Sequence, residues 1–305
     1  MQEDNIDVQH WQRYVEQETG FVLPNIQLQW LRNAVYHTAL SHRITAKSLW
    51  HQLPSNEDLR QQLLDKVLIH ESRFFRHMPS VDFVAQYAKQ HQLTANTGMS
   101  NDSIANDISD DGANKLFRIW SIGCASGQEP WSLAMSLSSE QLTNYKILAT
   151  DVSQQAILKA GLGQYDKRQQ LFMPQRYQQF IRLLKAESVI DKSNLYDLYT
   201  AKEAVTGTQV HWQIAPILRP YVRFALHNII EKRLPTSHLQ HVIICQNMLL
   251  YFRKFDQRDI LARLSEQCML GGYIILAPGE ALFWRPSNMR RIAHPQVNVW
   301  QKINA

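Results

Sequence analysis

A short glycine-containing stretch carries the clearest chemical signal in this sequence. Residues 118–137 read RIWSIGCASGQEPWSLAMSL: an apolar segment runs into a turn bounded by Gly123 and Gly127, followed by Gln128 and Glu129. A turn between a strand and a helix brings backbone amides close to a ligand, because glycine has no side chain in the way. The stretch therefore predicts a ligand site, with Gly123, Gly127 and Glu129 as candidate contacts.

The spacing of the turn separates three classes of ligand. Walker-type phosphate binding needs GxxxxGK[ST], but no lysine follows Gly127, and dinucleotide binding needs GxGxxG, whereas the spacing here is GxxxG. S-adenosylmethionine instead offers a sulfonium, an ammonium and ribose hydroxyls, which suit acceptor groups. Glu129 could accept from the ammonium and Asp151, ending the next predicted strand, from the ribose. Alternatively, Asp151 only caps the helix that begins at Ser153.

Composition restricts the class of protein. The 305 residues are 45% hydrophobic with a net charge of +5, which suits one large domain or a small domain plus a medium one. No apolar stretch approaches the roughly 18 to 20 residues of a membrane span, and the polar, acidic start is unlike a signal peptide. The modest positive charge indicates acidic partners without singling out nucleic acid. We expect a cytoplasmic protein.

Cysteine and histidine usage argues against a metal site. The three cysteines, Cys124, Cys245 and Cys268, are odd in number and lack CxxC spacing. This argues against a disulfide framework or a zinc site and fits a reducing cytosol. The twelve histidines are scattered, so we expect no bound metal.

The elements that must position the turn alternate between strand and helix. This alternation of strands and helices predicts a doubly wound parallel sheet that binds ligands at the carboxyl ends of its strands. Residues 165–221 interrupt it, and TGTQVHWQIAPIL (206–218) alternates enough to predict a small antiparallel insert. The predicted strands are 116–122, 145–151, 222–228, 241–247 and 273–279, and the predicted helices are 129–139, 153–163 and 255–270.

Helices precede this sheet. Residues 8–92 read as helical, and in the helix at 28–40 an apolar stripe is formed by Leu28, Leu31, Val35 and Ala39. Residues 94–115 are polar and small, which is typical of a flexible linker. We therefore predict a helical domain over 1–92, a linker over 93–115 and a catalytic domain over 116–305.

One helical segment has an unusual charge pattern. No acidic residue occurs from Asn25 to Asn56, whereas Arg32, Arg43 and Lys47 do. Two interpretations remain open: a solvated helical face, or a docking surface for an acidic partner helix.

Five segments in order resemble the CheR family of chemoreceptor methyltransferases. They are HESRFFRHMP (70–79), the glycine turn, LATDVSQQAILKAGLGQY (148–165), VRFALHNI (222–229) and VIICQNMLLYF (242–252). The likeness covers about residues 15 to 285, and HESRFFRH with the inserts is most similar to the type IV pilus chemosensory branch (PilK). The resemblance implies a Rossmann-like methyltransferase domain behind an all-α domain. It also implies methylation of receptor glutamates by S-adenosylmethionine, with S-adenosylhomocysteine as the product.

The resemblance also implies roles for individual residues. Ser72, at the hydroxyl position before the FFR triplet, would contact the cofactor, and Arg76 would lie near its methionine end. Glu129 would lie at its ammonium, Asp151 at its ribose and Asn228 beside the adenine.

The segment that resembles the family pattern CRNxxxYF supplies three more residues. Asn247 and Gln246 would contact the cofactor, and Tyr251 would lie beside the transferred methyl group. Two positions depart from the family: Gln246 replaces an arginine, and His70 replaces an asparagine. A charge-assisted hydrogen bond contributes about 1.5 to 3 kcal/mol, against ~1 kcal/mol for a neutral one. Losing the charge at Gln246 would thus cost roughly ten- to hundred-fold in binding or rate.

The implied reaction needs no general base. A glutamate side chain titrates near ~4.3 and is already ionised at neutral pH, so catalysis would come from alignment and a preorganised field. Arg76 and Tyr251 are the candidate catalytic residues that hold the incoming carboxylate. We expect Phe74 and Phe75 to serve core packing more than ligand stacking.

Three functions remain open at this stage. The first is an active, monomeric glutamate methyltransferase whose partner is the cytoplasmic signalling domain of methyl-accepting chemotaxis receptors. The second, suggested by Gln246 and His70, is a cofactor-binding regulator that docks on receptors without turnover. The third is methylation of another acidic protein.

Overall fold

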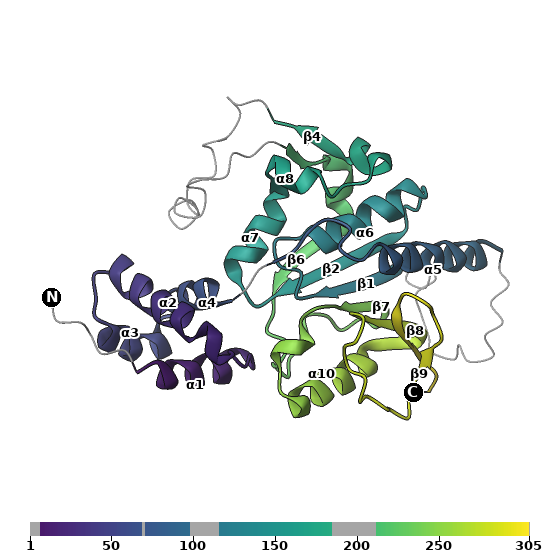
Figure 1. The fold of residues 1–305 in the computed structure, drawn as a ribbon. Coiled ribbons are helices and arrows are strands. Elements are labelled where there is room, and N and C mark those ends of the chain that lie inside the picture. The colour runs from purple at the N-terminus through teal and green to yellow at the C-terminus, as the bar shows by residue number, and fades with distance from the viewer. Residues whose placement is uncertain (1–6, 69–70, 98–115, 185–211, 305) are drawn as a thin grey trace.

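A twisted seven-stranded sheet forms the centre of the molecule in the computed structural model, which describes residues 7–68, 71–97, 116–184 and 212–304 (Figure 1). The strand order is β6-β2-β1-β7-β8-β10-β9. The strands are β1 (Phe117–Ile122), β2 (Tyr145–Asp151), β6 (Val222–Leu226), β7 (Gln240–Cys245), β8 (Cys268–Leu276), β9 (Met289–Ile292) and β10 (Asn298–Lys302).

Five of these strands are parallel, and their pairing explains their apolar sequences. Ile119 of β1 pairs with Ile147 of β2 on one side and with Val242 of β7 on the other. All residues of β7 are buried, as is usual for a parallel strand covered on both faces. From β1 the sheet grows through β2 to β6 in one direction and through β7 to β8 in the other. The crevice for a ligand is expected at this reversal of strand order.

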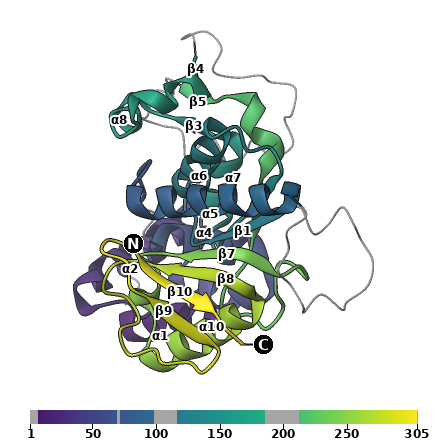
Figure 2. The ribbon, with the colours of Figure 1, turned by 90° about the vertical axis from the view of Figure 1, so that its right-hand side faces the viewer.

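Helices cover both faces of the sheet, and side chains alternate between the two layers. Ile119 packs in one buried cluster with α5 (Met78–Thr97) and α6 (Gln128–Ser139), whereas Trp120 packs in another with α10 (Lys254–Gln267). Figures 1 and 2 show α5 and α6 on the opposite side of the sheet from α10. The predicted doubly wound α/β fold is confirmed.

The predicted elements differ from the observed ones at the carboxyl end. The predicted helix at 255–270 ends at Gln267, because the apolar run from Cys268 enters the sheet as β8 beside β7. Strands β9 and β10 were not predicted. They are short and antiparallel, and β10 pairs with β8 through Trp300 and Ile274.

The N-terminal helices build their own core. Leu31 and Val35 of the predicted stripe are fully buried in it, and Asp7 caps the first helix by accepting from the Gln9 and His10 N–H groups. The helices are α1 (Val8–Thr19), α2 (Leu28–Ser41), α3 (Ala46–Gln52) and α4 (Glu57–Val67), with 3-10 turns η1 (Asn25–Gln27) and η2 (Leu53–Ser55). We call residues 7–67 the helical region.

Helix α5 does not pack with the helical region. Its residues Val84 and Ala88 are buried against the sheet, in the same cluster as Ile119. The predicted boundary at residue 92 therefore lies inside α5, and packing separates the two parts between α4 and α5. The predicted linker overlaps α5 up to Thr97, and its residues 98–115 lie outside the described part of the chain.

A three-stranded antiparallel sheet forms the predicted insert, with strand order β3-β5-β4. The aromatic ring of Phe74 contacts both Tyr165 and Trp212 and so joins the insert to the rest of the domain. The remaining elements are β3 (Gln164–Tyr165), β4 (Ile181–Leu183), β5 (Trp212–Ile214), α7 (Gln154–Leu162), α8 (Lys167–Gln170), η4 (Gln175–Phe180), η5 (Pro216–Tyr221) and η6 (Leu249–Tyr251). Residues 206–211 of the predicted insert lie outside the described residues.

Candidate cofactor and catalytic site

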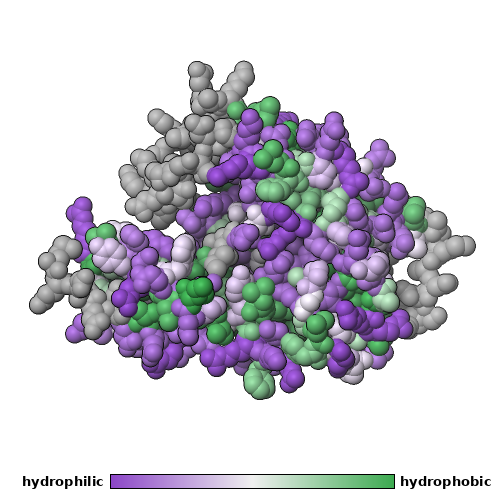
Figure 3. Space-filling model, in the orientation of Figure 1, coloured by the Kyte–Doolittle hydropathy of each residue, from purple (hydrophilic) through white to green (hydrophobic). Residues whose placement is uncertain are grey.

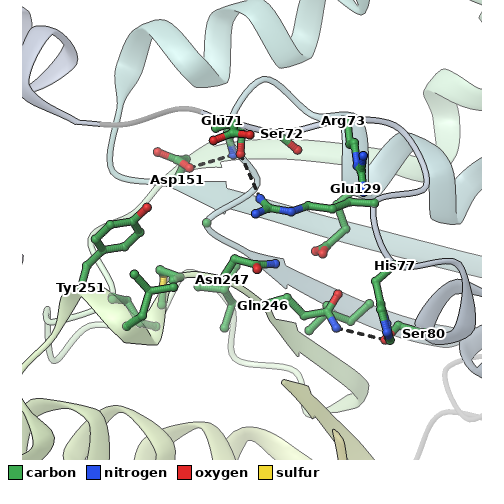
Figure 4. A pocket seen from close by; sticks show the side chains of 18 of the residues that line it. Glu71, Ser72, Arg73, His77, Ser80, Glu129, Asp151, Gln246, Asn247 and Tyr251 are labelled. Carbon is green, nitrogen blue, oxygen red and sulfur yellow. Dashed lines mark hydrogen bonds between the residues drawn. The ribbon is translucent and has the colours of Figure 1, made fainter. Parts of the chain in front are cut away.

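A pocket opens at the carboxyl ends of β1, β2, β6 and β7, where the strand order reverses (Figure 4). Every residue predicted for the cofactor or for catalysis lines it, with the exception of Gly127. Those lining residues are Ser72, Arg76, Gly123, Glu129, Asp151, Asn228, Gln246, Asn247 and Tyr251. Segments far apart in sequence thus meet at one place.

The two glycines of the turn have different tasks. The N–H groups of Gly123 and Cys124 donate to the Thr150 carbonyl at 2.8 and 3.0 Å, which holds the turn on the end of β2. Gly123 has φ +68° and faces the pocket. Gly127 has φ +90°, and a Cβ there would lie 2.8 Å from the Cβ of Ala160. Gly127 therefore permits close packing of α6 on α7.

Asp151 is fixed at the pocket by the turn itself. Its Oδ2 accepts from the Ala125 N–H at 2.8 Å, and its Oδ1 accepts from the Ser153 N–H at 3.0 Å. The N-cap of α7 is Ser153, whose Oγ accepts from the Ala156 N–H. Asp151 is therefore not the cap of this helix, and its carboxylate lines the pocket between two backbone donors.

Glu129 is the second acidic group, in the first turn of α6. The Ser121 hydroxyl donates to its Oε1 at 2.7 Å. Burial raises the pKa of Glu129 to about 7, against the lowering effects of Ser121 and of the Arg76 charge, while Glu280 adds a raising effect. A carboxyl group poised near neutrality becomes fully ionised when a cation binds beside it.

A tight loop presents Ser72 and Arg76 to the pocket. Phe75 adopts a left-handed backbone with φ 52°, its N–H donates to Ser132 Oγ at 2.9 Å, and its ring stacks on Tyr177 at 4.4 Å. Phe74 is buried in the core and Phe75 nearly so, which confirms the expected packing role, although Phe75 also reaches the pocket.

Arg76 closes the same loop. Its Nη1 donates to the Glu71 carbonyl at 3.2 Å while the side chain stays exposed at the pocket. His70, the other departure from the family pattern, lies outside the described residues.

The end of β7 is held by a buried carboxylate. Asn247 has φ 58°, and its N–H donates to Glu280 Oε2 at 3.2 Å. The Ala277 N–H donates to the same oxygen at 2.9 Å. Burial raises the pKa of Glu280, against the lowering effect of these backbone donors. Glu280 thereby ties the segment after β7 to the segment after β8.

The chain that follows α1 lies at the same pocket. Phe21 lines it and packs its ring on Tyr251 at 5.6 Å and on Phe252 at 4.8 Å. The Val22 N–H donates to the Tyr251 carbonyl at 2.8 Å. Sequence reasoning missed Phe21; the only local signal was Gly20 before it, which ends α1 with φ 75°.

The residues predicted for receptor docking lie elsewhere. Arg32 on α2, Arg43 after it and Lys47 on α3 are all exposed and do not line the pocket. In the space-filling view the surface is mostly hydrophilic, with small hydrophobic patches (Figure 3). The interpretation of these three cations as a docking surface stays a prediction.

The part of the chain that the structure describes contains neither a metal-binding cluster nor a membrane-spanning helix. There, no group of three or more His, Cys, Asp or Glu side chains is arranged to hold a metal ion. No helix in that part of the chain has the length and apolar character needed to cross a membrane. Cys124, Cys245 and Cys268 are buried and unpaired, and burial raises the pKa of each thiol.

The fold and the pocket together define a class of protein. The doubly wound fold places Asp151 at the end of β2 and Glu129 in the first turn of α6 as acceptors at one pocket, which fits the ammonium and ribose hydroxyls of S-adenosylmethionine. Residues 70–193 and 186–297 match the family model described as CheR methyltransferase, SAM binding domain. The chain therefore belongs to the CheR methyltransferase family, and its cofactor is S-adenosylmethionine.

The chain is similar to several known proteins. The chain is 26% identical over 241 residues to Chemotaxis protein methyltransferase 1 of Pseudomonas aeruginosa, covering 77% of this chain and 74% of that protein. It is 23% identical over 304 residues to Chemotaxis protein methyltransferase Cher2 of Pseudomonas putida, covering 96% of each. Among solved structures, the N-methyltransferase NodS from Bradyrhizobium japonicum aligns with 11% identity and a TM-score of 0.33, over 73% of this chain and 98% of that one.

Proposed function

We propose that this chain is a protein-glutamate O-methyltransferase that acts on the cytoplasmic signalling domain of methyl-accepting chemotaxis receptors. The observation that carries the proposal is one pocket, in a chain of the CheR family, that holds both acceptors for the cofactor and two groups suited to a carboxylate. Glu129 and Asp151 are the acceptors, and Arg76 and Tyr251 are the other two. The resemblance of HESRFFRH favours a receptor of a type IV pilus chemosensory system.

The pocket residues have separate roles in the proposed reaction. The bound cofactor supplies an electrophilic methyl group on its sulfonium. Asp151 accepts from the ribose and Glu129 from the ammonium, while the Arg76 guanidinium attracts the incoming carboxylate and the Tyr251 hydroxyl orients it. Phe21, packed on the Tyr251 ring, excludes water from this side. Such an arrangement accelerates transfer by alignment and a fixed electrostatic field.

No proton has to be removed from the nucleophile. A glutamate on an exposed receptor helix is ionised at neutral pH, and its charge is cancelled as the ester forms. Neutralising a glutamate changes the electrostatics between packed helices, which suits an adaptation signal. The exposed cations Arg32, Arg43 and Lys47 would attract such an acidic helix from solution.

A second candidate rests on the side chain at position 246. Gln246 is neutral and lines the pocket, so the chain could bind the cofactor and dock on receptors without turnover. In that case Gln246→Arg would be needed to recover transfer.

A methyl-transfer assay tests both candidates. Purified protein, tritiated S-adenosylmethionine and the cytoplasmic fragment of a receptor from the same genome are mixed, and base then releases volatile methanol from methyl esters. We expect label that is lost with Asp151→Ala and strongly reduced with Tyr251→Phe. Absence of label from every receptor fragment of that genome, on protein that binds the cofactor, would favour the regulator.

A further inference from the structure

The orientation of the Gln246 side-chain amide is fixed by its surroundings. Its Nε2 lies 3.0 Å from Ser80 Oγ and 3.2 Å from the main-chain carbonyl oxygen of Leu276. A carbonyl oxygen only accepts, so the amide nitrogen has to face Leu276. A flipped amide would bring two carbonyl oxygens together, and both N–H groups of Gln246 are therefore in use.

Ser80 is itself held in place, because it is buried at the start of α5. Its Oγ lies 2.7 Å from His77 Nδ1. Burial lowers the pKa of His77, against the raising effect of a hydrogen bond to the Gln296 backbone. A neutral imidazole that donates to Gln296 has Nδ1 free to accept the Ser80 hydroxyl proton. Ser80 then turns its lone pairs toward Gln246.

The remaining atom of the Gln246 amide is its carbonyl oxygen. Within the described residues Oε1 has no hydrogen-bond partner, and Gln246 lines the pocket. Figure 4 shows this oxygen turned toward the space that the Glu129 carboxyl group also faces, while the nitrogen points to Ser80. Gln246 thus offers the pocket an acceptor.

The neighbouring charges decide what such an acceptor can bind. The Glu129 carboxyl faces the same space, and two further charges act on it: the Arg76 cation lowers the pKa of Glu129 and the Glu280 carboxylate raises it. A ligand carboxylate placed here would meet a carbonyl oxygen and negative charge, both repulsive. A ligand ammonium has only donors and would find two acceptors, Glu129 on α6 and Gln246 after β7.

We propose that Gln246, oriented by Ser80 and His77, accepts a hydrogen bond from the ammonium group of the cofactor and shares that group with Glu129. Gln246 then contributes to recognition of the amino end and takes no part in holding either carboxylate. The inference rests on the cofactor site assigned above.

Binding of two ligands that differ only at the amino group tests the proposal. Isothermal titration would compare S-adenosylhomocysteine with its des-amino analogue, which keeps the carboxylate, on the full chain and on Gln246→Met. Methionine has similar length and makes no strong hydrogen bond. We expect about a tenfold loss for S-adenosylhomocysteine and a change of less than about twofold for the analogue.

Two further variants sharpen the result. Ser80→Ala removes one of the two contacts that orient the amide and leaves only the Leu276 carbonyl. It should therefore give a smaller loss, again selective for the amino-containing ligand, and it carries the test if Gln246→Met does not fold. Gln178→Met, at an exposed glutamine outside the pocket, should change neither affinity. Equal losses for both ligands, or no loss, would overturn the proposal. Wild-type protein that binds neither ligand would overturn the cofactor site itself.

Discussion

The side-chain amide of Asn228 donates a 2.6 Å hydrogen bond to the main-chain carbonyl of Glu18. Asn228 lines the cofactor pocket after β6, and Glu18 belongs to the last turn of α1. A second contact with the helical region involves Ser153. Its hydroxyl donates to Asp65 of α4 at 2.5 Å, and its N–H donates to Asp151. The helical region therefore contacts Asn228 directly and is linked to Asp151 through Ser153.

Removing the hydrogen bond between Asn228 and Glu18 should have two measurable effects: faster amide hydrogen exchange and weaker ligand binding. Asn228→Ala leaves the Glu18 carbonyl without its donor, so the segment at residues 18–22 should exchange amide hydrogens faster. We expect affinity for S-adenosylhomocysteine to fall roughly three- to tenfold, the equivalent of about one neutral hydrogen bond. Hydrogen exchange with and without ligand checks this. Faster exchange with unchanged affinity would show that Asn228 serves the helical region alone.

Asp151 should matter more for the cofactor than for folding. In Asp151→Asn the charge is lost and the amide cannot accept from both the Ala125 and Ser153 N–H groups, so we expect at least a tenfold loss of affinity. Asp166→Asn is the matched control, because Asp166 caps α8 and does not line the pocket. Titration and thermal unfolding of both variants provide the check. An equal effect of the two on affinity would contradict the role of Asp151.

Ligand affinity should depend on pH through Glu129, whose pKa burial raises to about 7. Protonation removes the negative charge that faces the ligand ammonium. Between about pH 7.5 and about pH 5.5 we expect affinity for S-adenosylhomocysteine to decline as the pH falls. Glu129→Gln should bind more weakly throughout and lack this slope. A wild-type profile that stays flat over the window would contradict the assignment.

Stability without ligand should respond to pH in the opposite sense. The folded-state pKa of Glu129 lies above the ordinary value of 4.5, so the folded state binds the proton more tightly than the unfolded state does. This contribution to the free energy of unfolding is complete below about pH 4.5 and is lost as the pH rises through about 7. Glu129→Gln removes it. The melting temperature of Glu129→Gln relative to wild type should therefore increase from pH 5 to pH 8.

Much of the fold and the site could be predicted because the signals are local. Apolar runs predicted the parallel strands, and the carboxyl ends of such strands meet at one edge of the sheet. Asp151 and Gln246 therefore meet there, and Glu129 joins them from the start of the helix that follows β1. Strands β9 and β10 escaped prediction because they are short and carry charged residues. Lys302 of β10 is buried only because its Nζ donates to the Ser265 carbonyl at 2.8 Å.

The contacts that were missed join residues far apart in sequence. Phe21 packs on Tyr251, and Ser80 orients Gln246. Neither contact produces a periodic or compositional pattern in the sequence, because each depends on how whole helices, strands and loops pack against one another. The ligand group that Gln246 recognises could likewise not be predicted from the residue type, because it depends on whether the amide oxygen or the amide nitrogen faces the pocket.

Gly127 should contribute more to the stability of the fold than to binding of the cofactor. Its φ of +90° and the 2.8 Å approach of a Cβ to Ala160 make Gly127→Ala costly, by about 1 to 3 kcal/mol in the free energy of unfolding. Affinity for S-adenosylhomocysteine, measured on the folded fraction, should change less than in Gly123→Ala, which alters the pocket wall. Chemical unfolding and titration separate the two effects. A larger loss of affinity in Gly127→Ala than in Gly123→Ala would mean that Gly127 belongs to the cofactor site.

The cations of the helical region provide a test of the proposed partner. Arg32→Glu, Arg43→Glu and Lys47→Glu together reverse the charge of an exposed surface remote from the pocket lining. If an acidic receptor helix docks there, KM for the receptor fragment should rise at least tenfold, with a weaker dependence on salt than in wild type. Affinity for S-adenosylhomocysteine should stay unchanged.

A matched control separates docking from net charge. Arg290→Glu with Arg291→Glu reverses two exposed cations on β9, at the far edge of the sheet. We expect this pair to alter KM for the receptor fragment by less than about threefold, since exposed charges beyond a Debye length of roughly 10 Å are largely screened at 0.1 M salt. Because one set reverses three charges and the other two, equal effects per reversed charge would mean that the receptor responds to total charge. The helical region would then lose its assignment as the docking surface.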